Sequence, residues 1–455
     1  TRVRSSAASD VYKRQIAGAG EVGSHLAKML SNENQDIIVI DSDQEKLDNL
    51  DSHYNLMTLN GSTSSFEAMR SAGINRADLY IAVTPYETRN IASCAIAKHL
   101  GVKKTVARID NYEFLKPENR KILKDLGIDT LIYPEFVASQ AIDLSLSHNW
   151  ARYWAELGNG QLNLIGVKIR SNSQLCGLKL KDMPVSAHHF HVSAIKRNAE
   201  TVIPGGNDTI EDNDIVYFIT TPEYVEEVRE LCGKKLRDID KVMIMGGSQI
   251  ALRFCHDFHD KYDILIIDIN RDRCEYLATE LPDVEVVNGD GRDVEVLREN
   301  NVYQYDAFVA LTNQSETNIL SCLTAKDFGV AKTIADVENL QFYSLAENLN
   351  IGHSINKKLM ASSSIFQILL DSDESNSKFL ALTDAEVCEL VVKEKAKITK
   401  SPVRDLHLPW GMTLAALIRD GQAELIGGNT HIMAGDHVVV FCLSGTISKI
   451  EKWFN

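Results

Sequence analysis

Three glycines near the start of the chain have the spacing of a turn that holds phosphate. Gly18, Gly20 and Gly23 follow the pattern G-x-G-x-x-G, and an apolar run at 37–40 then ends in an acid, Asp41. In such a turn the first glycine allows a tight bend from strand to helix, the second lets the backbone approach a pyrophosphate, and the third lets the helix pack on the strand. Unpaired N–H groups at the start of the helix face the phosphates. The stretch predicts a nucleotide site.

The acid that ends the second predicted strand indicates which nucleotide fits. Asp41 can accept hydrogen bonds from both ribose hydroxyls, and its charge would repel a 2′-phosphate. We therefore expect NAD(H) or an adenine nucleotide, ATP or ADP, rather than NADP(H).

The composition limits the kinds of partner. The chain has 455 residues, of which 44% are hydrophobic and 24% charged, and its net charge is −15. That acidity disfavours binding to a nucleic acid or to an anionic membrane surface. No apolar run reaches the roughly 18–20 residues of a transmembrane helix. The eight cysteines are scattered without a C-x-x-C pair, which is typical of reduced thiols in a cytoplasmic protein.

The residues before the glycines do not look like the strand that such a unit needs. Only Ile16 and Ala17 form an apolar pair there, and residues 1–15 are basic and rich in serine and alanine. We expect 1–15 to be a non-native lead, foreign to the fold, that stands in place of the native start. The first strand should then be weakened at its beginning.

The chain repeats itself at a nearly fixed offset. Gly246 follows Gly18 by 228 residues, and Asp268 follows Asp41 by 227. A register kept through many matches predicts two tandem halves of one fold. The further matched pairs are Asn60 with Asn288, Thr84 with Thr312, Asn90 with Asn318, and Cys94 with Cys322.

Short apolar strands alternate with helical stretches in each half, which predicts a parallel, doubly wound sheet. Alternating strands with Gly/Asp turns follow each sheet and predict a small α+β lobe. In the first half we expect strands at 37–40, 55–59, 79–83, 104–108 and 130–132, and helices at 21–31, 43–51, 64–73, 87–100, 111–126 and 135–157.

The predicted fold class is therefore α/β, with two tandem Rossmann-type doubly wound parallel sheets, each followed by a small α+β lobe. Linkers are expected near 158–160, 232–240 and 371–377. The expected parts are a Rossmann-type nucleotide-binding domain at 16–134, a crossover helix and linker at 135–160, a small lobe at 161–232, a second Rossmann-type domain at 240–360, a helix and linker at 361–378, and a second small lobe at 379–455.

Ligands of parallel sheets bind beyond the carboxyl ends of the strands. That rule places the glycine turn, Asp41, Thr84 and Arg108 on one rim. An arginine on this rim is suited to bidentate contact with phosphate. The alternative for Arg108 is an ordinary surface ion pair.

Other side chains do not form a recognisable catalytic or metal site. His189 and His191 would share one face of a strand, but no carboxylate or thiolate is spaced to complete a metal site around His188-His-Phe-His. Trp150 and Trp154 lie four apart on a predicted helix. They are interpreted either as a buried stripe or as a contact with a neighbouring subunit.

The chain lacks the features of an oxidoreductase. Such an enzyme needs a substrate domain with a proton donor or acceptor beside the nicotinamide. Here the remaining length repeats the nucleotide lobe and adds small lobes. A protein that binds a nucleotide and leaves it unchanged is favoured over a soluble NAD-dependent oxidoreductase.

These motifs together resemble the TrkA family, the cytoplasmic regulatory subunits of bacterial Trk-type potassium uptake systems, which are built from duplicated RCK units (a KTN lobe followed by an RCK-C lobe). The resemblance covers nearly all of 16–454. It is carried by 18–23, Asp41, 82–84, Asn90, 107–109, 133–135 and 311–318, and in the small lobes by 194–197, 202–204, 417–421 and 435–436.

The resemblance implies a regulator that binds NAD(H), ATP or ADP without turnover. It also implies a homotetramer on the inner face of the cell membrane, bound to the membrane-embedded, potassium-translocating Trk subunit. A regulator of another cation channel or antiporter is the alternative. The residues implied at the nucleotide are Gly18, Ala19, Gly20, Glu21 and Val22 for the pyrophosphate, with Gly23 completing the turn, Asp41 for the ribose, and Thr84 and Arg108 for the remaining phosphate and ribose groups.

The two halves depart from the family pattern in different ways. In the first, Pro85 removes a backbone donor. In the second, Gly246, Gly247, Ser248 and Asp268 mark the counterpart site. There, serine and alanine replace two glycines, and Asp336 stands where Arg108 stands. A serine Cβ crowds the pyrophosphate and an aspartate repels it, so we expect the first site to be the main one and the second to be weak, altered or structural.

Overall fold

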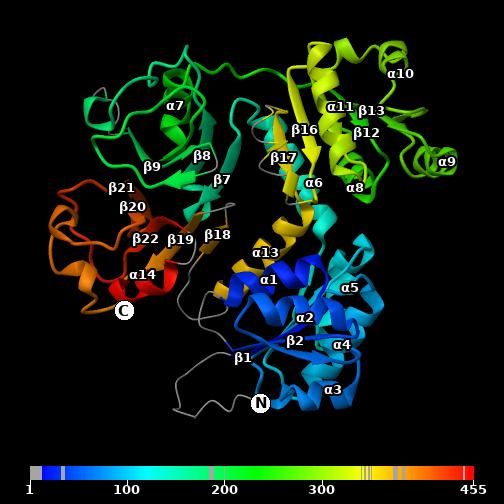
Figure 1. The fold of residues 1–455 in the computed structure, drawn as a ribbon, viewed down its shortest axis with the longest axis horizontal. Helices are drawn as coiled ribbons and strands as arrows, with labels where there is room; N and C mark the ends of the chain where they lie inside the picture. The colour runs from blue at the N-terminus through cyan, green and yellow to red at the C-terminus, as the bar shows by residue number, and fades with distance from the viewer. Residues whose placement is uncertain are drawn as a thin grey trace. The chain divides into compact units, whose positions relative to one another are not determined.

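The computed structural model describes residues 13–454 apart from 32–35, 184–188, 199, 340, 343–344, 347–348, 350, 372–377, 382–384 and 444–445. The chain divides into two compact units (Figure 1). The first comprises the chain up to Pro134 together with Lys358–Ile368, and the second comprises Glu135–Lys357 and Leu369–Asn455. Of the predicted linker at 371–377, Asp371 ends a helix and 372–377 lie outside the described residues.

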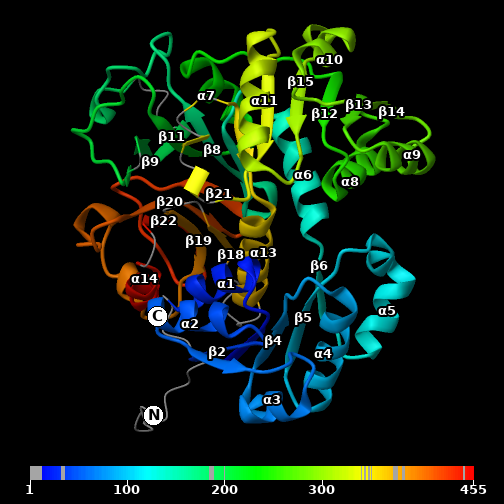
Figure 2. The ribbon, with the colours of Figure 1, turned by 45° about the vertical axis from the view of Figure 1, so that its right-hand side comes forward.

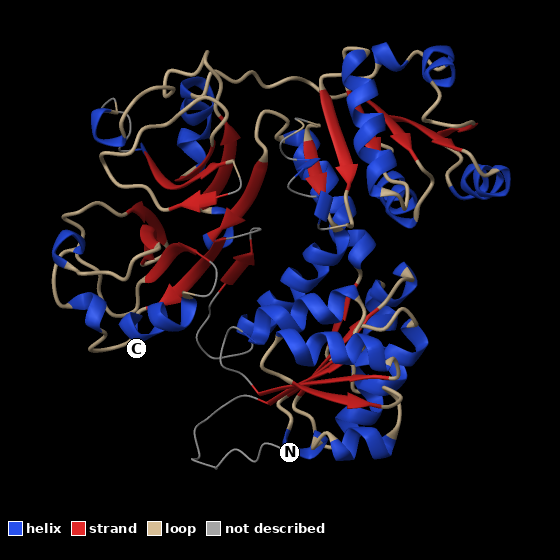
Figure 3. Ribbon diagram, viewed as in Figure 1, coloured by secondary structure: helices blue, strands red, loops and turns tan. Residues whose placement is uncertain are grey.

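The first unit contains the first nucleotide lobe, a parallel sheet with helices on both faces (Figure 3). The strand order β3-β2-β1-β4-β5-β6 is that of a doubly wound fold, so the predicted fold class is confirmed. Its strands are β1 (Lys13–Ala17), β2 (Asp36–Asp41), β3 (Met57–Asn60), β4 (Leu79–Ala82), β5 (Lys104–Arg108) and β6 (Thr130–Ile132), and its helices are α1 (Glu21–Ser31), α2 (Gln44–His53), α3 (Phe66–Ser71), α4 (Glu87–His99) and α5 (Pro117–Asp125).

The first strand begins earlier than the sequence indicates. Strand β1 starts at Lys13, and the polar side chains of Arg14 and Gln15 are only 3% and 1% exposed. Gln15 Nε2 donates to the Ala72 carbonyl at 2.6 Å, so a polar residue serves in a central strand. The expectation that only Ile16 and Ala17 form this strand is wrong.

The second nucleotide lobe repeats the first. Its strand order, β14-β13-β12-β15-β16-β17, is the same order shifted along the chain. The repeat expected from the offset is therefore confirmed. Its strands are β12 (Lys241–Met245), β13 (Asp263–Asp268), β14 (Glu285–Asn288), β15 (Ala307–Ala310), β16 (Lys332–Asp336) and β17 (His353–Ile355), and its helices include α8 (Gln249–Phe258), α9 (Arg271–Glu280), α10 (Val294–Glu299) and α11 (Ser315–Asp327).

Each small lobe is an antiparallel sheet, and the two lobes share one apolar core. Leu164 and Tyr217 of the first pack in the same buried cluster as Val387 and Phe441 of the second. The first lobe contains β7 (Tyr153–Leu157), β8 (Leu162–Lys168), β9 (Phe190–Arg197), β10 (Glu200–Val202), β11 (Ile215–Thr220) and α7 (Val225–Leu231), and the second contains β18 (Lys378–Ala381), β19 (Ala385–Val391), β20 (Met412–Arg419), β21 (Gln422–Leu425), β22 (His437–Leu443) and α14 (Ile447–Phe454).

The predicted helix at 135–157 is wrong in its second half. Helix α6 (Pro134–Ser147) ends early, and Tyr153–Leu157 forms strand β7 of the small lobe. The expected linker at 158–160 is therefore the turn between β7 and β8. Trp150 and Trp154 are not on one helix; their rings meet edge-on with centroids 6.0 Å apart.

The two long connecting helices each pack against the nucleotide lobe of the other half. Asp143 of α6 accepts a hydrogen bond from Tyr262 Oη at 2.7 Å in the second lobe. Helix α13 (Lys357–Asp371) lies beside α1 of the first lobe (Figures 1 and 2), and Ser362 Oγ donates to the Val22 carbonyl at 3.2 Å.

Among the described residues, no helix is both long enough and apolar enough to cross a bilayer.

An arginine–aspartate pair fixes the end of each small sheet. In the second lobe, Arg419 binds the carboxylate of Asp436 through Nε and Nη2 at 2.8 and 2.6 Å, and Met433 N donates to it at 2.7 Å. Burial alone would raise the pKa of Asp436, but these donors outweigh it and hold the pKa below its ordinary value. Arg197 and Asp214 form the same pair in the first lobe.

This pair should make a measurable contribution to stability. Asp436→Asn leaves the guanidinium without its buried anion, so we expect the free energy of unfolding at pH 7 to fall by about 3 kcal/mol in urea titrations. Because the folded-state pKa is depressed, the advantage of the wild type is present above the ordinary pKa of 3.8 and is lost as the pH falls through the folded value.

The matched control for Asp436→Asn is an exposed ion pair. Glu295 and Arg298 keep 71% and 57% of their side chains exposed, so Glu295→Gln should change stability by no more than about 0.5 kcal/mol. Equal urea midpoints for Asp436→Asn and the wild type would contradict a stabilising role for the pair.

Candidate nucleotide site

The first glycine turn joins β1 to α1, and its three glycines meet different surroundings. Gly18 has a φ of +113°, and a Cβ on Gly23 would lie 1.9 Å from the Gly18 carbonyl oxygen. The backbone conformation therefore favours glycine at position 18, and close packing requires glycine at position 23. A Cβ on Gly20 would meet no protein atom within 4 Å, so the space above Gly20 is open to a ligand.

Asp41 ties this turn to the end of β2. Its Oδ2 accepts from Ala19 N at 2.6 Å, and its Oδ1 accepts from Asp43 N at 2.9 Å. Each carboxylate oxygen can accept a further hydrogen bond. Asp41 therefore shapes the turn and still has acceptor capacity for a ribose hydroxyl.

An asparagine holds together the ends of β4 and β5. Thr84 N and Oγ1 both donate to Asn90 Oδ1, at 3.0 and 2.6 Å. Asn90 Nδ2 in turn donates to the carbonyls of Thr84 and Arg108, both at 2.9 Å. The Thr84 hydroxyl therefore donates its proton to Asn90. Asn90 is a positioning residue, whereas the sequence analysis used it as a repeat marker and as part of the family resemblance.

The rim of the first lobe carries two cations, one at the end of β5 and one at the start of α1. Arg108 is half-buried at the end of β5, and within the described ranges its guanidinium forms no ion pair. Lys358, from α13, pairs with Glu21 at the start of α1. Sequence reasoning could not find Lys358, because it lies more than 300 positions from the turn that it touches.

The second lobe keeps the same scaffold. Gly246 has a φ of +98°, Gly247 N donates to Asp268 Oδ2 at 2.6 Å, and Asn270 N donates to Oδ1 at 2.8 Å. Asn318 repeats the clamp, accepting from Thr312 Oγ1 at 2.6 Å and donating to the Asp336 carbonyl at 2.8 Å.

An arginine covers the second turn. The Arg273 guanidinium donates to the carbonyls of Gly247 and Ser248, whereas its counterpart in the first lobe, Lys46, pairs with Asp43 at 3.0 Å. The Ser248 hydroxyl accepts from Ala251 N at 3.3 Å and caps α8. Ser248 and Ala251, which replace two of the glycines, therefore bind each other within the protein.

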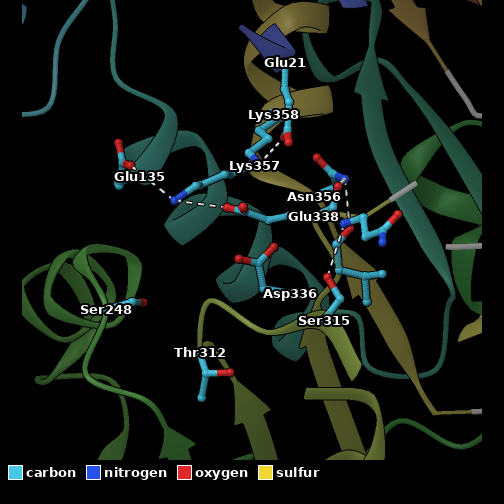
Figure 4. A network of polar contacts seen from close by, with 12 residues as sticks. Glu21, Glu135, Ser248, Thr312, Ser315, Asp336, Glu338, Asn356, Lys357 and Lys358 are labelled. Carbon is cyan, nitrogen blue, oxygen red and sulfur yellow. Dashed lines mark hydrogen bonds and ion pairs between the residues drawn. The ribbon is translucent and has the colours of Figure 1, made fainter. Parts of the chain in front are cut away.

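Acidic side chains surround the second rim. Asp336 and Glu135 are both 4% exposed, and Figure 4 shows them with Ser248 and Thr312 around the carboxyl end of this sheet. Lys357 bridges Glu135 and Glu338, at 3.7 and 3.2 Å. Glu135 occupies the repeat position of Lys358, so a carboxylate stands where the first lobe receives an ammonium.

The histidines are used in packing and polar contacts. His189 Nδ1 lies 2.8 Å from Glu227 Oε2, and its ring stacks on Tyr224. Burial lowers the pKa of His191 to about 4. His188 lies outside the described residues, and among those described no group of His, Cys, Asp or Glu is placed to hold a metal ion.

Two Rossmann-type lobes in one chain, each with a glycine turn fixed by an aspartate and each followed by a small antiparallel lobe, define a tandem RCK protein. The TrkA-N domain model matches residues 15–134 and 242–357, and the TrkA-C domain model matches 164–233 and 387–455. The chain belongs to the TrkA family.

Curated relatives agree with this assignment, and solved structures agree with the fold. The chain is 30% identical to Trk system potassium uptake protein TrkA homolog 1 of Methanosarcina mazei, covering 97% of this chain and 100% of the relative. It is 30% identical to TrkA of Vibrio alginolyticus, covering 96% and 98%. The fold matches the GsuK RCK domain with a TM-score of 0.60 at 13% identity, covering 98% and 95%, and the GsuK channel bound to NAD with 0.59 at 13%, covering 98% and 79%.

Two alanine substitutions should separate the roles of the glycines. Gly20→Ala adds a Cβ that meets only open space, so we expect wild-type thermal stability but at least about tenfold weaker NADH binding, because the methyl group blocks the approach of the pyrophosphate. Gly23→Ala forces a backbone clash and should cost about 2 kcal/mol of stability. Fluorescence titration with NADH and thermal unfolding measure both effects, and unchanged NADH affinity in Gly20→Ala would contradict the assignment.

Proposed function

We propose that this chain is the nucleotide-binding regulatory subunit of a membrane potassium uptake transporter, and that it senses NAD(H), ATP or ADP without consuming it. The observation that carries the proposal is the contrast between the two turns. The first is open above Gly20, with Lys358 beside it and Arg108 at the end of β5, whereas the second is covered by Arg273 and has Asp336 and Glu135 on its rim. The names of the TrkA relatives support the potassium uptake role.

The first lobe supplies each group that a bound dinucleotide needs. The turn from Gly18 to Gly23, which includes Ala19, Glu21 and Val22, places the first N–H groups of α1 against the pyrophosphate. Asp41 accepts from the ribose, and Arg108 offers a bidentate donor to a phosphate or ribose group. Thr84 helps to shape the rim through Asn90, and Lys358 offsets the charge of Glu21 near the phosphates.

The link from nucleotide to regulation passes through α13. Lys358 and Ser362 of this helix contact Glu21 and the Val22 carbonyl, which are at the start of α1 directly after the turn. Nucleotides that differ in charge at the phosphates will compete differently with Glu21 for Lys358. A ligand shifts a conformational equilibrium only by its difference in affinity for the two states, and this contact supplies such a difference.

The proposed assembly is a homotetramer that acts at the cytoplasmic face of the membrane on the membrane-embedded Trk subunit. The fold likeness to RCK domains of the GsuK channel keeps a regulator of another cation channel or antiporter as the second candidate. Neither candidate requires catalysis: on the first rim Thr84 and Asn90 serve as positioning groups, and Glu21 is paired with a lysine.

Calorimetry should resolve one strong nucleotide site per chain. We expect wild type to bind about one NADH, Gly20→Ala to lose that site, and Asp268→Asn in the second lobe to retain it. Lys358→Gln should weaken binding about tenfold by leaving the Glu21 charge uncompensated. Two equal sites per chain, or loss of binding in Asp268→Asn alone, would overturn the assignment.

Potassium uptake tests the function itself. The assay uses cells that lack their own TrkA-type subunit and express a Trk membrane subunit. The wild-type chain should restore rubidium uptake in these cells. With Gly20→Ala, the rate of rubidium uptake should not respond to nucleotide. Purified protein should leave the 340 nm absorbance of NADH constant with keto acids present. Steady NADH oxidation would contradict the proposal.

A further inference from the structure

A buried tyrosine holds the loop that follows β3 in the first nucleotide lobe. Tyr80, on β4, is fully buried, and its Oη donates to the Thr63 carbonyl at 2.7 Å. Thr63 is the middle residue of the loop at 61–65, which joins β3 to α3. Burial raises the pKa of Tyr80 above its ordinary value, so the hydroxyl keeps its proton and this hydrogen bond persists near neutral pH.

The same loop is tied to the aspartate that we assign to the ribose. Gly61 N donates to the Asp41 carbonyl at 2.9 Å, and Ser65 N donates to the Ser62 carbonyl at 3.0 Å. The strand order β3-β2-β1 places the loop, Asp41 and the glycine turn at three successive carboxyl ends. The base and the phosphates are attached to opposite ends of the ribose. A nucleotide with its phosphates at the turn therefore brings its base to the loop.

The loop offers a directional donor to a base. Ser62 is exposed, and within the part of the chain that the structure describes its N–H forms no hydrogen bond. A backbone N–H can only donate, so it fits N1 of adenine, which accepts, and opposes N1 of hypoxanthine, which carries a proton. The hydroxyls of Ser62 and Ser64, 3.2 Å apart, can accept from the amino group of adenine. The loop is therefore suited to adenine.

The second lobe lacks this arrangement. Phe308, at the repeat position of Tyr80, has no hydroxyl to donate. A Cβ on Gly291, which takes the repeat position of Thr63, would lie 2.5 Å from Met245 Cγ, so a threonine does not fit beside that methionine. Met245 and Phe308 belong to one buried cluster. The loop after β14 is therefore packed against apolar side chains, without the hydrogen bond that fixes its counterpart.

We propose that Tyr80 is a positioning residue for the adenine of a nucleotide bound at the first turn, and that its hydroxyl holds the loop at 61–65 so that the Ser62 N–H meets the base. Tyr80 acts through the Thr63 carbonyl and does not contact the nucleotide. A buried carbonyl that loses its donor is costly, so the loop shifts when this hydroxyl is absent. The inference rests on the proposed function, and it adds that the first lobe selects adenine over other purine bases.

Fluorescence titration of the full chain with NADH and with reduced nicotinamide hypoxanthine dinucleotide tests this role. We expect the wild type to bind NADH about tenfold more tightly than the hypoxanthine analogue, because the analogue places a donor against the Ser62 N–H. Tyr80→Phe, which copies the second lobe, should weaken NADH binding about tenfold and leave the affinity for the analogue nearly unchanged. A merely structural role of the tyrosine would weaken the binding of both dinucleotides equally.

The matched control removes an equivalent hydrogen bond at the opposite edge of the same sheet. Thr105, near the amino end of β5, is fully buried, and its Oγ1 donates to the Gly127 carbonyl at 2.6 Å. Thr105→Val should lower the melting temperature at least as much as Tyr80→Phe does. It should keep the wild-type affinity for NADH and the wild-type preference for adenine.

Hydrogen exchange in the wild type completes the test and does not depend on the folding of any variant. Saturating NADH should slow the exchange of the amide protons at 61–65. The inference is overturned, and the proposed function stands, if the wild type binds NADH but this exchange is unchanged. The same holds if Tyr80→Phe binds NADH like the wild type or loses affinity for both dinucleotides equally. Absence of NADH binding to the wild type would overturn both.

Discussion

One carboxylate at the end of the second strand fixes each glycine turn of this protein. Asp41 receives the N–H of Ala19 at 2.6 Å, and Asp268 receives that of Gly247 at the same distance. A tight turn leaves backbone donors without partners, and a charge-assisted hydrogen bond of this kind is stronger than a neutral one. The turn is therefore shaped by the protein before any nucleotide arrives, and the same interaction survives in both halves. What distinguishes the halves is the set of side chains around this common scaffold.

The two rims have diverged in charge. The first has Arg108 at the end of β5 and receives Lys358 from α13, whereas the second has Asp336 and receives Glu135 from α6. Arg273 adds a further difference, since it binds the carbonyls of the second turn while Lys46 turns instead to Asp43. The exchange of connecting helices matters here, because each rim is completed by residues from the other half. Duplication of one lobe has thus produced one turn that is open above Gly20 and one that is closed by the protein's own groups.

Much of this could be predicted from local sequence and much could not. The strand at 104–108, the helix at 21–31 and the repeat register were predicted because hydrophobic periodicity and glycine spacing act locally. The helix at 135–157 was predicted too long, because the apolar residues of β7 continue a helical pattern although they pair with β8. The start of β1 was not predicted, because Arg14 and Gln15 are polar although both are buried in this strand. Lys358 and Glu135 were missed because their roles depend on which helix crosses to which lobe. Arg273 was missed because the sequence does not show that its guanidinium binds the carbonyls of the turn in its own lobe. Thr84 is predicted to contact the nucleotide, but its hydroxyl donates to Asn90.

The central claim is that the first turn binds nucleotide and the second does not. A structure of the full chain determined with saturating NADH tests it most directly. The account predicts density for a dinucleotide between Gly20, Asp41 and Arg108, with Arg273 still covering Gly247 and Ser248 in the second lobe. Density of equal strength at both turns, or at the second turn alone with Arg273 displaced, would contradict it.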